Sequence, residues 1–357
     1  MINRELIRIK TLQLTYAYYQ NGYGDLLVDE GLLKSSKSSI AQLRKGSTSS
    51  LSADLSVDAA DDKRLLEKSI DKVEKELLFS LDKAYELYHV LLSLIVAVHT
   101  EMVHRYEVRT ARCVREGLDV PSTRFAENRF ALQLSENEML NSYIAAHNPD
   151  WHEHIDIVRR LCQQIEQSNV YADYMSAECE TDYDTDREVW RKLYKLLIAD
   201  SDVLDDFLEE KSLYWNDDKT VVDDFVLKTI KRFREKNGSD QSLLPAWHDD
   251  GDRAFAVGLL RASLLHAEEY HEYMRSASEH WDFERIAFMD VIIMQMALAE
   301  MCTFTEIPVN VTINEYVELS KLYSTSKSST YINAMLDAIA RELATKGKLM
   351  KTMKNEL

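Results

Sequence analysis

The sequence predicts an all-α protein. Only 9 glycines and 4 prolines occur in 357 residues, so few positions interrupt a regular element. Leu, Ala, Glu, Lys and Met recur at three- and four-residue steps, whereas sustained period-two alternation, the signal of half-buried strands, is missing. A hydrophobic content of 45% is enough to bury a core, and the length suits about two domains.

The first predicted element is an amphipathic helix over residues 3–20, which Asn3 can cap. Apolar side chains recur along one expected buried face, at Leu6, Ile9, Leu12, Tyr16 and Tyr19. A separate polar stripe holds Arg4, Arg8, Thr11 and Thr15. We expect the arginines of this stripe to project away from the core.

The middle of the chain begins with a serine-rich stretch, residues 35–62, that has no aromatic residue and no proline. Its apolar surface is too small to offset the entropy of ordering, which predicts a flexible loop. Residues 63–107 then form one long helix or two. Further helices continue to the C-terminus, with breaks predicted near Pro149, over residues 237–252 and at Pro308.

The last break predicts a helix that begins at or just after Pro308 and ends near Tyr323. The hydroxyl-rich turn "STSKSS" follows, and Ser328 or Ser329 can cap a final helix. The buried stripe of that final helix is Ile332, Met335, Leu336, Ile339 and Leu343.

Lys327 and Tyr331 lie at the start of the final helix, where free backbone amides, a cation and an aromatic ring converge. This combination suits an unstacked base and its phosphate. On these residues alone, a satisfied helix–turn–helix within a core is the more economical interpretation.

The net charge of −18 argues against nonspecific binding to nucleic acid, so any RNA site must be a small basic island. Acidic runs such as "DSDVLDDFLEE" are interpreted as solvated helix faces, with a divalent-cation site as the open alternative. The 4 cysteines form no CxxC pair, and Met1 leads directly into a charged helix, which predicts a cytoplasmic protein. The apolar stretch over residues 90–98 is too short for a membrane span and predicts a core helix.

Two stretches near the C-terminus resemble the NusB family of transcription antitermination factors: "HWDFERIAFMDVIIMQMALAEM" and "IPVNVTINEYVELSKLYSTSKSSTYINAMLD". Several short motifs fall in the family's order at compatible spacing, over about residues 252–349. The first helix, "RELIRIKTLQLTYAYY", is similar to the family's basic opening helix. More than two hundred residues between these parts have no counterpart in the short bacterial proteins, so the chain resembles a long form with a helical expansion.

The resemblance implies a binding protein without chemistry of its own. NusB pairs with NusE, a small-subunit ribosomal protein, and the pair grips the boxA element of nascent RNA. RNA polymerase in this antitermination complex then ignores premature termination signals, notably on ribosomal RNA operons. The RNA-binding positions implied for this chain are Arg4, Arg8, Lys10, Lys327 and Tyr331.

Tyr16 and Asp290 are the positions that the resemblance implies for the NusE-facing surface. No cofactor, metal or membrane is implied. The family often has a denser arginine cluster on its first helix, which Lys10 replaces only in part, so the electrostatic grip on RNA should be weaker. Lys327 stands where a common form of the family has an acid, a change that should favour phosphate.

Two other classes of function remain open. Glu101 with His104, and Glu268 with His271, are Glu-x-x-His pairs of the kind found in di-iron helical bundles. Because the chain has 61 acidic residues and 10 histidines, such pairs also arise by chance. The remaining alternative is a helical protein-interaction scaffold with no role in RNA binding.

We therefore expect four segments: an N-terminal basic helix of the NusB-like core (1–32), a flexible loop (33–62), a helical expansion (63–250) and a C-terminal NusB-like helical domain (251–357). A gapless shift of 66 residues also lays the segment from Asp186 onto the segment from Asp252, and Trp215 then meets Trp281. This alignment predicts a structural repeat of two helices around a turn that ends at tryptophan, with chance similarity between helical sequences as the alternative.

Overall fold

The computed structural model describes residues 1–20, 58–147, 149, 151–177, 182–215, 217–277 and 286–349, with side chains from residue 64 onward in the second range. Within these residues the regular elements are helices and no strand occurs, which confirms the predicted all-α class. Most of the serine-rich stretch and Trp281 lie outside the described residues.

The chain forms two compact units. Unit 1 contains Met1–Ile2 and Asp82–Ala246, and unit 2 contains Asn3–Leu81 and Trp247–Leu357. The long helix α4 (Asp58–Glu116) contributes its first part to unit 2 and the remainder to unit 1. Both units are therefore discontinuous in sequence, and residues 82–246 of unit 1 interrupt unit 2.

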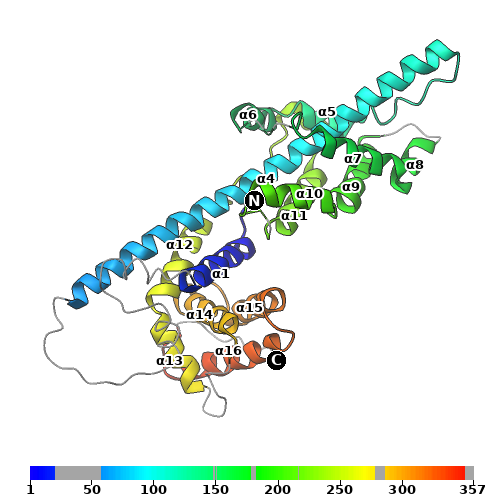
Figure 1. Ribbon diagram of the computed structural model, residues 1–357. Coiled ribbons are helices and arrows are strands. Elements are labelled where there is room, and N and C mark those ends of the chain that lie inside the picture. Colours follow the sequence, from blue (N-terminus) through cyan, green and yellow to red (C-terminus); the bar gives the residue numbers. More distant parts are fainter. Residues whose placement is uncertain are drawn as a thin grey trace. The chain divides into compact units, whose positions relative to one another are not determined.

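Besides the first part of α4, unit 2 contains α1 (Arg4–Gln20), α12 (Asp250–Leu265), α13 (Ala267–Ala277), α14 (Phe288–Thr303), α15 (Val309–Tyr323) and α16 (Ser328–Thr345). Helix α14 is the centre of this unit and packs against α1, α12, α13, α15 and α16 (Figure 1). Its sequence "VIIMQMALAEM" is apolar around the whole circumference, as expected for a helix enclosed on all sides.

Several predicted elements of unit 2 are confirmed. The N–H of Leu6 donates to Oδ1 of Asn3 at 2.9 Å, which is the predicted cap of α1. Helix α15 begins directly after Pro308 and ends at Tyr323, as predicted. The predicted stripe of α16 is buried at Ile332, Met335, Leu336, Ile339 and Leu343.

Unit 1 contains the second part of α4, and Figure 1 shows α4 as one uninterrupted helix. Its further helices are α5 (Arg129–Ser135), α6 (Glu138–His147), α7 (Ile155–Gln167), α8 (Asn169–Ser176), α9 (Tyr183–Leu193), η1 (Tyr194–Ile198), α10 (Asp202–Lys211), α11 (Lys219–Arg232) and η2 (Glu235–Asp240). Large side chains fill its interior, including the fully buried Tyr88, Trp190 and Tyr194.

Helix α4 is long and apolar enough to cross a membrane by length and composition alone. Of its most apolar window, however, 67% is buried within the fold. This burial agrees with the predicted core helix over residues 90–98, where most side chains are enclosed. We therefore assign the apolar stretch of α4 to the core.

The predicted repeat agrees with the helix boundaries. A shift of 66 residues places α9 with η1 over residues 249–264, where α12 lies, and α10 over residues 268–277, where α13 lies. Helix α11 falls over residues 285–298, close to α14. Trp215 is buried, but its predicted counterpart, Trp281, lies outside the described residues, so the tryptophan part of the prediction remains untested.

Candidate RNA-binding surface

The polar stripe of α1 is buried rather than exposed. Arg8 is only 5% exposed, and Thr11 and Thr15 are fully enclosed. The prediction that the arginines of this stripe project away from the core is therefore wrong for Arg8. Helix α1 packs against both α12 and α14, so more than one of its faces is covered, and the periodicity of α1 alone cannot reveal this.

Two carboxylates hold the guanidinium of Arg8. Its Nε and Nη2 donate to the two oxygens of Glu300 at 2.8 and 3.0 Å, and its Nη1 donates to Glu315 at 2.8 Å. The hydroxyls of Thr312 and Tyr316 donate to the same Glu300 carboxylate at 2.9 and 3.2 Å. Burial lowers the pKa of Arg8, but the hydrogen bond to Glu300 and the charges of Glu300, Tyr316 and Glu315 together outweigh burial and raise the pKa. These charge-assisted hydrogen bonds hold the Arg8 side chain in the core of unit 2.

Arg4 and Lys10 differ in exposure. The side chain of Arg4 is 39% exposed, its Nε lies 3.8 Å from Oδ1 of Asp252, and its guanidinium lies 5.0 Å from the centre of the Phe255 ring. Lys10 is buried. Of the three α1 cations implied for RNA binding, Arg4 is therefore the one with a partly exposed side chain.

Asp290 organises the turn between α15 and α16. Its carboxylate accepts hydrogen bonds from the hydroxyl of Ser324 and, at 2.8 Å, from that of Ser328. The hydroxyl of Ser328 is thereby directed at Asp290, and Lys327 occupies the N-cap position of α16 without a side-chain capping bond. The predicted cap at Ser328 or Ser329 is therefore wrong. The serine hydroxyls of the turn donate to Asp290 of α14, and no side chain of the turn caps the backbone amides of α16.

The structure brings Lys327 and Tyr331 together at the amino end of α16, where the N–H of Tyr331 donates to the carbonyl of Lys327 at 3.4 Å. The side chain of Lys327 is exposed and forms no ion pair with any described residue. The ring of Tyr331 is half-buried. Burial, and then the charge of Asp290, raise the pKa of Tyr331 to about 12, so its hydroxyl is neutral at physiological pH.

Tyr16 lies near the amino end of α14. It is 36% exposed, and its ring centre lies 5.9 Å from that of Phe288. Tyr19 contacts the same Phe288 ring, and Gln295 donates to its hydroxyl at 2.9 Å. Because Phe288 precedes Asp290 by two residues, Tyr16 and Asp290 share one end of α14.

The implied binding residues thus gather at opposite ends of α14. Arg8 contacts Glu300 near the carboxyl end, whereas Asp290 fastens the turn of Lys327 and Tyr331 at the amino end. Ten residues of helix separate these carboxylates, or about 15 Å. The residues implied for RNA therefore form two groups, and those implied for NusE lie with the second group.

Comparison with known proteins identifies the part of the chain that carries α14, α15 and most of α16. The model of the NusB family matches residues 224–341. A protein of Salinibacter ruber named transcription antitermination protein NusB is 34% identical over 133 residues, which are 36% of this chain and 83% of that relative. A protein of the same name from Geobacter sulfurreducens is 41% identical over 95 residues, 27% of this chain and 69% of that relative. The chain belongs to the NusB family.

The NusB match is partial along this chain. It includes η2, α12, α13, α14 and α15 and most of α11 and α16, so α1 and most of unit 1 lie outside it. No solved structure was found to match the chain. The predicted resemblance is confirmed: a NusB-family region in the C-terminal part is accompanied by an extra helical region.

Two glutamates of the NusB region, Glu300 and Glu315, were missed by sequence reasoning although they hold Arg8. Glu300 is fully buried within the apolar run of α14. A carboxylate in such a run requires a cationic or hydrogen-bonding partner, because an unpaired buried charge is very costly. That isolated glutamate was therefore the signal that could have assigned Arg8 to the core.

The two Glu-x-x-His pairs belong to different units of this NusB-family chain, and their members have other partners. Glu101 pairs with Arg105 at 3.2 Å in unit 1. In unit 2, Nε2 of His271 lies 2.8 Å from Oε1 of Gln295, and Glu268 pairs with Arg275. Burial lowers the pKa of His271, against the opposing effect of the Gln295 hydrogen bond. The geometry gives the di-iron hypothesis no support.

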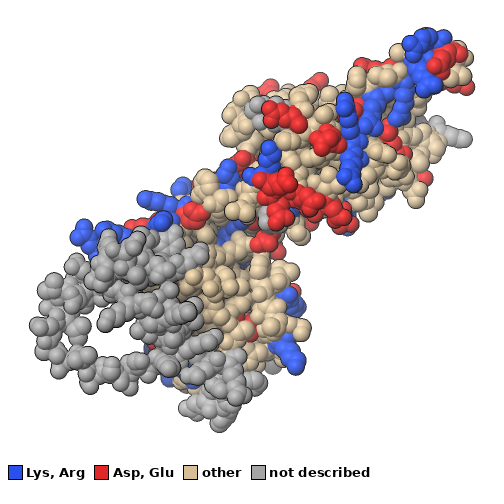
Figure 2. All heavy atoms as spheres, viewed as in Figure 1, with Lys and Arg blue, Asp and Glu red and all other residues tan. Residues whose placement is uncertain are grey.

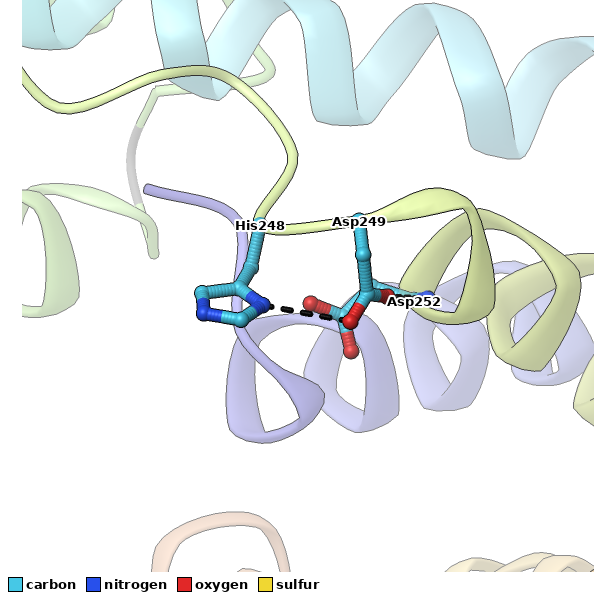
Figure 3. Close-up of side chains that lie close together, drawn as sticks. All are labelled: His248, Asp249 and Asp252. Carbon is cyan, nitrogen blue, oxygen red and sulfur yellow. Dashed lines mark hydrogen bonds and ion pairs between the residues drawn. The ribbon is translucent and has the colours of Figure 1, made fainter.

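A separate group of potential ligands, His248, Asp249 and Asp252, lies at the start of α12 (Figure 3). Oδ1 of Asp249 accepts from the backbone N–H of Asp252 at 3.1 Å and caps α12, while Nδ1 of His248 lies 3.2 Å from the other oxygen of Asp249. These bonds, and the proximity of Arg4 to Asp252, account for the cluster as a helix cap.

Proposed function

We propose that this NusB-family protein binds boxA RNA of nascent transcripts together with NusE, as part of a cytoplasmic RNA polymerase antitermination complex that acts in ribosomal RNA transcription. The observation that carries the proposal is the amino end of α16 within the NusB match. There an exposed lysine without an ion-pair partner among the described residues lies beside a half-buried tyrosine. The relatives named transcription antitermination proteins support the same assignment.

The chemistry of this helix end suits a single-stranded nucleotide. No side chain caps α16. The N–H of Ser328 donates to the carbonyl of Thr325 at 3.0 Å, and the backbone amides that follow it can donate to a phosphate. Lys327 adds a positive charge at the same place, and the ring of Tyr331 offers a surface on which a base can stack. This small cationic site is compatible with the net charge of −18, which opposes binding to nucleic acid elsewhere.

The α1 cations contribute unequally in this proposal. Arg4, partly exposed, is placed to contact RNA phosphate directly, in exchange for its long contact with Asp252. Arg8 and Lys10 are buried, so we assign them an indirect contribution through the position of α1. The electrostatic attraction to RNA then comes from few charges, as expected from the small number of basic residues on this helix.

For NusE we propose contact with Tyr16, whose ring is partly exposed beside Phe288. Asp290 is buried and bonded to two serines, so we assign it a supporting role in which it fixes the turn next to that surface. The NusE-facing and RNA-facing residues would then be adjacent, which lets one partner order the surface used by the other.

The test measures the affinity of the full chain for a fluorescent boxA RNA and for a scrambled RNA of equal length and composition, each with and without NusE. We expect boxA to bind more tightly than the scrambled RNA, and NusE to increase that difference. Equal affinities for the two RNAs in the presence of NusE would contradict the proposal. Binding of NusE without any RNA binding would favour the protein-interaction scaffold.

A further inference from the structure

Unit 1 contains an aromatic-lined cavity of about 230 Å³ that the NusB match does not include. Aromatic walls come from Tyr143 on α6, from Trp151 before α7, from Phe207 on α10 and from Trp215 after α10. Two carboxylates, Glu86 and Glu153, also line it. The volume is below the roughly 300–1,000 Å³ of most small-molecule sites, so it suits one side chain better than a cofactor.

Hydrogen bonds from both indoles fix the aromatic walls. Nε1 of Trp151 donates to the hydroxyl of Ser93 at 2.9 Å, and Nε1 of Trp215 donates to the carbonyl of Lys83 at 2.9 Å. Because each indole N–H is bonded to α4, the rings are held in place with their apolar surfaces available to the cavity. The ring of Phe207 lies 5.5 Å from that of Trp151, within the range of paired aromatic rings.

The wall contains the basic side chains Lys211, His147 and His154, and its two carboxylates can hold a further cation. Glu153 is exposed and forms no ion pair with any described residue, and Glu86 has one pairing, with Lys83 at 2.5 Å. The hydroxyl of Tyr143 is buried without a hydrogen-bond partner in the described part of the chain. Burial, and then the charge of Glu86, raise the pKa of Tyr143, so this hydroxyl stays protonated.

A cation already occupies part of this environment. Nζ of Lys211 lies 5.5 Å from the centre of the Phe207 ring, which shows that the aromatic wall accepts positive charge. Helix α10 also carries five exposed acidic residues, Asp202, Asp205, Asp206, Glu209 and Glu210. Figure 2 shows acidic side chains gathered over the region of α10 and α11. Such a surface repels nucleic acid and attracts basic protein segments.

We propose that this cavity binds an arginine side chain from a basic segment of a partner protein. The planar guanidinium can stack on the tryptophan and phenylalanine rings while it donates hydrogen bonds to Glu86 and Glu153. The acidic residues of α10 attract the basic residues on either side of that arginine. Unit 1 is in this way a protein-docking module added to a NusB core.

The test uses the full chain labelled with 5-fluorotryptophan, followed by ¹⁹F NMR. The probe is the peptide Ac-Gly-Arg-Gly-NH₂, and the matched neutral peptide carries citrulline in place of arginine. Adenosine monophosphate serves as the nucleotide probe. Trp151→Phe and Trp215→Phe variants assign the two resonances of the cavity.

We expect the arginine peptide to shift the Trp151 and Trp215 resonances in a saturable manner, and the citrulline peptide to bind at least about tenfold more weakly, since it lacks the charge. Glu153→Gln should weaken the arginine peptide about two- to fivefold. Phe207→Leu should weaken it more, by about three- to thirtyfold. Glu138→Gln, an exposed position of α6 outside the wall, is the matched control and should leave the affinity unchanged.

Three results would overturn the proposal. Equal shifts with the arginine and citrulline peptides would show an apolar slot for any side chain. Tighter binding of adenosine monophosphate would show a nucleotide site. If the labelled protein is folded and no probe shifts its resonances, the cavity is a packing defect. Each result is independent of boxA binding, so failure here leaves the proposed function intact.

Discussion

Arg8 shows how a residue that resembles a binding site can belong to the core. Removal of a buried arginine with two carboxylate partners is strongly destabilising, because it leaves the fully buried Glu300 without its cationic partner. Its place on a basic helix is therefore explained by its bonds to α14 and α15.

We predict that Arg8→Ala lowers the free energy of unfolding of unit 2 by about 3–5 kcal/mol. Arg4→Ala, on the same helix but partly exposed, should cost at most about 1 kcal/mol. Urea denaturation followed by circular dichroism measures both. If Arg8→Ala were as stable as Arg4→Ala, the buried ion pair would not be a principal support of this unit. A double replacement of Arg4 and Arg8 cannot test RNA contact, because it also removes that support.

Lys327 is the residue on which the RNA proposal depends most. Lys327→Gln should weaken boxA binding in the presence of NusE and make its dependence on salt shallower by about 0.7 in log–log slope, the effect of one phosphate contact with single-stranded RNA. Arg341→Gln on the same helix is the control, because Arg341 is exposed and pairs with Asp337 at 2.8 Å. An unchanged slope in Lys327→Gln, or an equal change in Arg341→Gln, would remove Lys327 from the RNA contact.

His271 makes the stability of unit 2 depend on pH. Its pKa is lowered in the folded protein by burial, whereas the unfolded chain has the ordinary value of about 6.5. The unfolded state therefore binds a proton first as the pH falls. The stabilisation from neutral His271 is complete above about pH 6.5 and is lost as the pH decreases towards the folded value.

We expect the urea midpoint of unit 2 to decrease between pH 7.5 and pH 5.5, and to decrease less in His271→Gln, which removes the titrating group. The comparison with that variant is needed because buried His89 and His99 of unit 1 also have lowered pKa values. An equal decrease in both proteins would show that His271 does not contribute to the pH dependence.

At the scale of elements, the turn between α15 and α16 is held from outside by Asp290. Removing one hydroxyl that donates to a carboxylate costs about 1.5–3 kcal/mol. Ser328→Ala should therefore increase hydrogen exchange in residues 324–331, as measured by mass spectrometry, while α14 stays protected. Ser326→Ala, an exposed position of the same turn, is the control. Equal exchange in the two variants would show that the bond to Asp290 does not order the turn.

The hydrogen bond from Ser328 to Asp290 also affects how a replacement of Asp290 can be interpreted as a test of NusE contact. A lysine at this position would face the hydroxyls of Ser324 and Ser328 instead of accepting from them. It would therefore disturb the turn that carries Lys327, and a loss of NusE affinity in Asp290→Lys would not by itself prove direct contact. Tyr16→Ala tests the NusE surface more cleanly, because the Tyr16 ring is partly exposed and packs against Phe288.

The helices themselves were predictable, because their signals are local. Asn3, Pro308 and the apolar stripe of α16 each act within a few residues of chain. The site was predictable only in part. The adjacency of Lys327 and Tyr331 follows from sequence spacing, whereas the bonds from Glu300 to Arg8 and from Asp290 to Ser328 join separate helices, and no periodicity within one helix encodes them.

At the scale of the whole molecule, the family match and the compact units describe different parts of the chain. The apolar pattern of α4 continues from unit 2 into unit 1, so a single helix gives no local sign of where one unit ends. Unit 1 has its own basic surface: Arg109, Arg112 and Arg115 are exposed near the carboxyl end of α4, where Figure 2 shows basic side chains gathered. Arg109 pairs with Glu166 and Arg112 with Glu116, which reduces the charge available to RNA.

The most direct test of the account is to map the RNA contact on the full chain. The protein, NusE and boxA RNA containing 4-thiouridine are cross-linked by ultraviolet light, and the modified peptides are identified by mass spectrometry. We expect cross-links within residues 324–334, at the amino end of α16. Cross-links confined to unit 1, such as those around Arg109 to Arg115, with none in α16, would contradict it.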